Sequence, residues 1–244
     1  MSAKPFRLGT TTFAPGERKT VDLPVSALSN HTPLTLPVHV IHGDEPGPVL
    51  FLSAVVHGDE ILGAEIVRRV IRHRSLHKLA GTLLAVPVVN AFGLISHSRY
   101  MPDRRDLNRS FPGSDHGSLA SIVADLFMRE VVLKSDYGID LHTAAQHRTN
   151  LPQVRIAPGE PDLLQMAEAF GPPVILVSKL REGTLRHCAR DRGVKERLDR
   201  LARLYARQQA SSARRSIGRQ FRREKRTNGS AEAHQCHVRA THVV

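Results

Sequence analysis

The sequence predicts an α/β fold, with a mixed, mostly parallel sheet covered by helices on both faces. Apolar runs of strand length alternate with segments of helical periodicity over residues 36–194, which is typical of a sheet flanked by helices. Residues 49–56 are apolar except for Ser53, as in a strand buried on both faces. With 244 residues and 41% apolar content, the chain suffices for one large α/β domain, or for a catalytic domain with a small addition.

The first elements follow from local patterns. Residues 1–35 contain Pro and Thr throughout and are expected to form an irregular or β-rich N-terminal arm. Residues 36–42 and 48–56 are expected to form strands, separated by a turn that contains Pro and Gly. Residues 60–74 are expected to form a helix. Its apolar face would comprise Ile61, Ala64, Val67, Val70 and Ile71.

The alternation continues through the later elements. Residues 82–89 are expected to form a strand, and residues 90–117 a long polar loop. A loop of that length inside a compact domain usually carries function. Further helices are expected at residues 118–133, 161–170 and 183–194, and further strands at residues 137–142 and 172–178. The strand at residues 172–178 is apolar enough to be buried, and the last helix would end at Gly193.

Three residues are candidate metal ligands. His57 and Glu60 stand three positions apart, directly after the apolar run. A pair so placed where a strand gives way to a helix can reach one metal ion, and zinc accepts imidazole nitrogen and carboxylate oxygen. His142 ends another apolar segment and should lie at the same sheet edge, where open α/β sheets build their sites. Taken alone, the pair is a weak signal, and a helix-start Glu beside a hydrogen-bonded His is its more frequent explanation.

A second motif lies in the long loop. Residues 99–113 read RYMPDRRDLNRSFPG, and the Pro and Gly residues indicate an ordered loop. Guanidinium groups near a metal suit anion recognition, because their planar fork matches a carboxylate. The same segment, taken alone, also suits a solvated basic loop.

The order of these motifs resembles a known family. HxxE is followed by an Arg, by DLNRSFPG, and by DLHT within LHTAAQHRTNLP at residues 141–152. This series resembles the aspartoacylase and succinylglutamate desuccinylase family of metallocarboxypeptidase-like zinc hydrolases. The resemblance covers residues 38–194 and implies a deacylase that hydrolyses the amide, or ester, bond of small N-acyl amino acids. A cytoplasmic location is expected by default, because we expect neither a membrane span nor a secretory signal.

The resemblance also implies roles for single residues. One zinc ion per chain would be bound by His57, Glu60 and His142. Arg99 would polarise the scissile carbonyl and stabilise the oxyanion, because a fixed cation near the developing charge lowers the barrier. The free carboxylate of the substrate would be held by Asn108 and Arg109, and Asp140 would orient a ligand, as carboxylates around zinc-bound His often do.

The family pattern stops at about residue 195. In the family the resemblance points to, the general base is a Glu on a late apolar strand, which should follow residue 194. The chain reads KERLDR there, and neither Glu196 nor Asp199 lies in an apolar strand, so neither is taken as the base. Residues 181–244 hold 17 Lys and Arg against 6 Asp and Glu, a net charge of +11 out of the chain's +12. We expect three regions: an arm at 1–35, an incomplete catalytic domain at 36–194, and a basic tail at 195–244 with one helix followed by disorder.

Two explanations of the tail remain open. It is either a natural basic segment that binds acidic partners or the product of a shifted reading frame, because GC-rich codons read out of frame often encode Arg. We favour the frame shift, since the pattern is lost just before the strand that should carry the base.

Several functions are compatible with these observations. The leading hypothesis is the zinc deacylase, impaired by loss of the general base, and the alternative is an inactive zinc-binding relative. A peptide carboxypeptidase fits less well. So does a nucleic-acid binder, because the tail has few aromatic residues for base stacking. No apolar segment approaches the length of a membrane span, and no secretory signal begins the chain.

Overall fold

The computed structural model describes residues 2–144, 151–192 and 238–243. An eight-stranded sheet is formed by β3 (Arg18–Ala27), β4 (Pro33–His42), β5 (Glu45–Ala54), β6 (Ala80–Val86), β7 (Tyr137–Thr143), β8 (Gln153–Ile156), β9 (Val174–Val177) and β10 (Val238–Val243). A separate two-stranded sheet is formed by β1 (Phe6–Leu8) and β2 (Thr11–Phe13). The α-helices are α1 (Leu62–Ile71), α2 (Ala91–Ser96), α3 (Leu119–Glu130), α4 (Pro161–Phe170) and α5 (Leu185–Asp191), and the short 3-10 turns are η1 (Arg74–Lys78), η2 (Leu107–Arg109) and η3 (Val132–Lys134).

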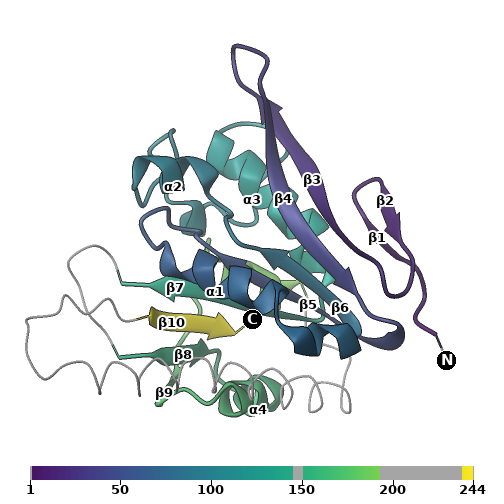
Figure 1. The fold of residues 1–244 in the computed structure, drawn as a ribbon. Coiled ribbons are helices and arrows are strands. Elements are labelled where there is room, and N and C mark those ends of the chain that lie inside the picture. Colours follow the sequence, from purple (N-terminus) through teal and green to yellow (C-terminus); the bar gives the residue numbers. More distant parts are fainter. Residues whose placement is uncertain (1, 145–150, 193–237, 244) are drawn as a thin grey trace, which may run out of the picture.

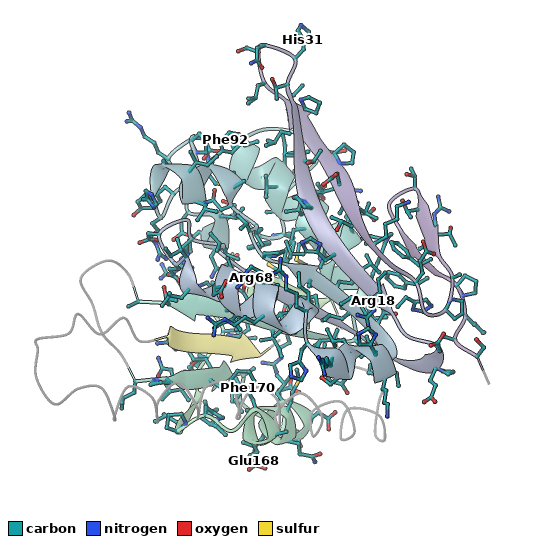
Figure 2. The ribbon with its side chains drawn as sticks, viewed as in Figure 1. Arg18, His31, Arg68, Phe92, Glu168 and Phe170 are labelled. Atoms are coloured by element: carbon teal, nitrogen blue, oxygen red, sulfur yellow. The ribbon has the colours of Figure 1, made fainter. Side chains whose placement is uncertain are left out.

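The sheet is mixed, as the sequence predicts. Its order is β3-β4-β6-β5-β7-β10-β8-β9 (Figure 1). The centre, β6-β5-β7, is parallel. The hairpin β3-β4 joins this centre antiparallel, through β4 and β6, and its tip is marked by His31 in Figure 2. On the other side β10 is antiparallel to β7 and parallel to β8.

Helices cover both faces of the sheet, which confirms the predicted layering. Alternate side chains of β5 separate the two layers. Leu50 and Leu52 belong to one buried cluster with Val67 of α1. Phe51 belongs to the other, which includes residues of α3 and α5, and meets the ring of Phe127 on α3 edge-on at 5.9 Å. In Figure 1, α1 crosses the near face of the sheet and α3 lies behind it. The buried centre is therefore apolar on both sides, as the run at residues 49–56 indicates.

One glycine shows how closely the central strands pack. Phe51 on β5 lies beside Gly138 on β7 in the parallel register. A Cβ added to Gly138 would lie 2.0 Å from the Phe51 ring. The absence of a side chain at position 138 thus leaves room for the ring, and the same register places Ser53 beside Asp140 two residues further along.

Several element boundaries differ from the expectation. The N-terminal arm is β-rich, but β3 within it belongs to the main sheet. The helix expected at 60–74 is shorter, and Ile61, which precedes it, is 45% exposed. The long loop contains α2 and η2. Strand β9 is not buried as expected, because it is an edge strand whose Val177 is 60% exposed.

The expectation that the end of the basic tail is disordered is wrong. Residues 238–243, which were expected to be disordered, form β10 between β7 and β8. Backbone pairing admits this segment even though its sequence, VRATHV, lacks a continuous apolar run. The helix expected in the tail before its disordered part and the helix end expected at Gly193 lie outside the described residues. Among the described helices, none has the length and apolar character needed to cross a membrane.

Candidate metal centre

The three candidate ligands come together at the carboxyl ends of β5 and β7. His57 and Glu60 lie in the turn between β5 and α1, and His142 lies on β7. Their ligand atoms all lie within 4.8 Å of one another. All three side chains are buried, with exposures of 4–5%. The structure therefore gathers the predicted triad at the sheet edge where the sequence places it.

Both imidazole rings turn the Nδ1 atom toward Glu60. Nδ1 of His57 lies 2.9 Å from Oε1 of Glu60, and Nδ1 of His142 lies 2.9 Å from Oε2 of the same carboxylate. Each Nε2 faces a different carboxylate: Asp106 at 3.1 Å from His57 and Asp140 at 2.7 Å from His142. Carboxylates behind ligand histidines fix ring orientation and tautomer in metal sites, so both Nδ1 atoms are turned toward one shared point beside Glu60.

The charges of the cluster fit a cation. Burial alone would raise the pKa of Glu60, but hydrogen bonds from His142 and His57 outweigh it and hold that pKa well below its usual value. Burial alone would lower the pKa of His142, but the Asp140 and Glu60 carboxylates raise it to about 10. The buried carboxylates thus demand positive charge between them. A divalent metal supplies that charge and requires deprotonated ligands, so two nitrogens and a carboxylate suit zinc.

Asp106 is a site residue that the sequence analysis missed. Besides His57, its carboxylate binds the guanidinium of Arg99 at 3.0 Å and accepts a hydrogen bond from the backbone N–H of Asn108 at 2.9 Å. Burial would raise the pKa of Asp106, yet His57 and Arg99 hold it well below its usual value. The local signal is an Asp that begins a 3-10 turn, η2, and caps it with its own side chain.

Arg99 lies at the metal cluster. One terminal nitrogen of Arg99 is 3.5 Å from Oε1 of Glu60, and the Arg99 side chain is 30% exposed. The guanidinium is therefore anchored by Asp106 on one side while part of it still faces solvent. A partly exposed cation beside the ligands is placed to contact an anionic group of a bound molecule.

Asn108 and Arg109 lie on the loop next to this cluster. The side-chain oxygen of Asn108 accepts a hydrogen bond from the backbone N–H of Leu185 at 3.0 Å, which ties the loop to α5. Arg109 lines a pocket of about 550 Å³ together with Phe111, Glu182 and His187, among others. Burial lowers the pKa of Arg109. The structure thus brings Arg99 against Glu60, whereas the pocket that Arg109 lines includes none of the three candidate ligands.

The general base is not identified within residues 2–144, 151–192 and 238–243. On the side of β7 away from β5 lies β10, whose six residues include no Asp or Glu. Residues 193–237, which follow the helix α5, lie outside the described part of the chain.

Comparisons with known proteins agree with this geometry. The family model for the succinylglutamate desuccinylase/aspartoacylase catalytic domain matches residues 46–214. The N-alpha-acetyl-L-2,4-diaminobutyric acid deacetylase of Halomonas elongata is 31% identical over 148 residues. That match covers 58% of this chain and 43% of the deacetylase.

Solved structures share the fold. An aspartoacylase family protein from Mesorhizobium loti is 27% identical, with a TM-score of 0.60 over 67% of this chain and 54% of that protein. The product-bound ectoine utilization protein EutE from Ruegeria pomeroyi is 22% identical, with a TM-score of 0.67 over 88% of this chain and 70% of that protein. The chain therefore spans less than half of the Halomonas relative and about half of the Mesorhizobium one.

Proposed function

The chain belongs to the succinylglutamate desuccinylase/aspartoacylase family, and we propose that its site is that of a zinc-dependent hydrolase of small N-acyl amino acids. The observation that carries the proposal is the buried cluster of His57, Glu60 and His142, whose ligand atoms lie within 4.8 Å of one another. Each imidazole is also backed by a carboxylate at 3.1 Å or less.

Different residues of the chain bind the metal and stabilise charge in the transition state. His57, Glu60 and His142 hold the ion, one zinc per chain. When bound, zinc acts as a Lewis acid on the amide or ester carbonyl and lowers the pKa of water to about 7. Arg99, held in place by Asp106, contributes positive charge where the oxyanion develops. Loss of one such donor costs on the order of 3 kcal/mol in the barrier.

Substrate orientation is assigned to the loop after Arg99. Arg109 holds the free carboxylate of the amino acid, since its guanidinium fork matches that group, and Asn108 supports it. The hydrogen bond from Leu185 to Asn108 keeps this loop fixed against α5. The name of the Halomonas relative makes N-acetyl-diaminobutyrate a sensible first substrate to test.

We propose further that turnover by this chain is impaired. The family's general base is expected on a strand after residue 194, and β10, the described strand in that part of the chain, reads VRATHV and contains no carboxylate. A missing general base costs on the order of 10²–10⁴ in rate. An inactive zinc-binding relative is the limiting case of this proposal.

Metal binding and turnover test the two parts separately. The metal-free 244-residue chain is titrated with zinc against a chromogenic chelator, beside His57→Ala and the exposed control His77→Ala. Binding of one zinc by wild type and by the control, but not by His57→Ala, supports the site. Failure of wild type to bind zinc would refute it.

The hydrolysis assay uses N-acetyl-diaminobutyrate and N-acetylaspartate with excess zinc. Slow release of the amino acid that disappears in Arg99→Ala supports an impaired enzyme. Rates equal to those of a relative with an intact base contradict the impairment, and zinc binding with zero turnover on any N-acyl amino acid supports the inactive relative.

A further inference from the structure

We propose that Ser53 is a positioning residue, which sets the orientation of His142 through Asp140. The inference rests on the proposed metal site and extends it by one residue on a neighbouring strand. Ser53 is the polar interruption in the apolar run at residues 49–56. A hydroxyl placed in a strand that is buried on both faces is costly unless it is hydrogen-bonded, so its partner indicates its purpose.

The sheet register places the two side chains together. Ser53 on β5 lies beside Asp140 on β7 in the parallel pair. Ser53 is 0% exposed and Asp140 is 1% exposed. Oγ of Ser53 donates to Oδ1 of Asp140 across 2.8 Å. The bond is thus shielded from water and joins the central strands on the face that carries His142.

Asp140 transmits this contact to the metal ligand. Its second oxygen, Oδ2, lies 2.7 Å from Nε2 of His142, and Nδ1 of that ring faces Glu60. A carboxylate is planar, so fixing Oδ1 fixes the direction in which Oδ2 points. When the hydroxyl is removed, Oδ1 is buried without this donor, and rotation of the carboxylate misdirects the ring.

The other ligand histidine is supported differently. Asp106, behind His57, is held by the Arg99 guanidinium and by the backbone N–H of Asn108. Within residues 2–144, Oδ1 of Asp140 has only one hydrogen-bond donor, the neutral hydroxyl of Ser53. Removal of the Ser53 hydroxyl can therefore disturb the orientation of His142 while the support of His57 stays intact.

Zinc affinity of the 244-residue chain, measured by chelator competition, tests the inference. Ser53→Ala should weaken zinc binding on the order of tenfold, within the range seen when supports of metal ligands are lost. Ser135→Ala is the matched control, because Ser135 is also buried and donates its hydroxyl across 2.8 Å, but to the carbonyl of Val131. Its zinc affinity should equal that of wild type.

A double variant tests the route through Asp140. If Ser53 acts only through that carboxylate, Ser53→Ala combined with Asp140→Ala should bind zinc no more weakly than Asp140→Ala alone. Additive losses would overturn the proposed route. If Ser53→Ala does not fold, Ser53→Cys should weaken binding in the same direction, because its slightly larger thiol fills the site but is only a weak donor.

The outcomes distinguish this inference from the proposed function. Absence of zinc binding by wild type refutes the metal site itself. Zinc binding by wild type with an unchanged affinity in Ser53→Ala and Ser53→Cys overturns the role of Ser53 and leaves the metal site standing. Equal losses in Ser53→Ala and Ser135→Ala would show a general effect of lost packing, which also overturns it.

Discussion

Asp106 lies 3.1 Å from Nε2 of His57, although the two residues are 49 positions apart in the chain. The same carboxylate binds Arg99 and caps the turn that carries Asn108 and Arg109. One side chain therefore connects a metal ligand, the cation proposed for the oxyanion, and the loop proposed to hold the substrate carboxylate.

Asp106→Asn should impair metal binding and catalysis together. The amide keeps an acceptor for the turn but removes the charge that holds both His57 and Arg99. Zinc affinity should fall by about 10- to 100-fold, and any residual hydrolysis should fall further because Arg99 loses its anchor. Chelator competition and an amino-acid release assay measure the two effects.

Asp125→Asn is the control for this variant. It removes an equivalent carboxylate that pairs with Arg129 at 2.8 Å on α3. Equal zinc affinities in Asp106→Asn and Asp125→Asn would show that Asp106 does not orient His57.

Gly58→Ala should disrupt the metal-binding turn. A Cβ at position 58 would lie 1.9 Å from the backbone of Gly93 in α2, and backbone cannot give way as a flexible side chain can. The turn between His57 and Glu60 would have to shift. The free energy of unfolding should fall by about 3 kcal/mol and zinc binding should weaken, as measured by denaturant titration and chelator competition.

Gly159→Ala separates this clash from a backbone effect. Gly159 has a positive φ of 76°, and a Cβ there would meet nothing within 4 Å. Its cost should be limited to about 1–2 kcal/mol of backbone strain, with zinc affinity unchanged. If Gly58→Ala bound zinc as well as Gly159→Ala, the close approach to α2 would not matter to the site.

Glu130→Gln should remove a pH-dependent contribution to stability. Burial would raise the pKa of Glu130, but Lys134 at 2.6 Å and the backbone N–H of Gly9 at 3.0 Å outweigh it, so the pKa is lowered. A lowered folded-state pKa means that the contribution is present above the unfolded pKa of about 4.3 and is lost as pH falls through the folded value.

The loss at neutral pH should be about 1 kcal/mol, since the ion pair is partly exposed. It should vanish at strongly acidic pH, when the carboxyl is protonated in both states. Urea unfolding at several pH values measures it, with Glu168→Gln on the exposed side of α4 as control (Figure 2). A pH-independent loss would mean that packing of the arm, and not charge, is what Glu130 provides.

Reading the coding DNA tests the origin of the tail. If the reading frame shifts near codon 195, translation in another frame should reveal an apolar strand with a Glu and a Gly-rich turn after residue 194. Resequencing from codon 185 beyond the stop codon, with all frames translated, provides the measurement. Three frames without such a strand would establish the basic tail as natural.

The ligand triad could be predicted because its signals are local. His57 and Glu60 follow an apolar run, and His142 ends another, so the strand ends indicate one sheet edge, and the order of the motifs indicates the role as ligands. Asp106 could not be found in this way, because its role arises from hydrogen bonds to distant residues. A charged residue in a polar loop has the same local pattern whether or not it faces a metal ligand.

The fold class was also predictable, whereas the place of the last strand was not. Strand patterns are read from apolar alternation, and VRATHV at residues 238–243 has little of it. Its position depends on the edges that β7 and β8 leave open for backbone pairing. Such pairing is a property of the assembled sheet and not of the segment.

The position of β10 has a consequence for the order of folding. Strands β8 and β9 are joined to the parallel centre of the sheet through β10, which begins about a hundred residues after β7 ends. Contacts between such distant segments form slowly, because the entropy of closing a long loop must be overcome first. Until β10 arrives, β7 exposes an open edge beside the metal ligand His142, and an open edge can pair with another chain. Pairing of β10 with β7 is therefore expected to be the slowest step in formation of the site. Self-association of the chain should compete with this pairing at high protein concentration.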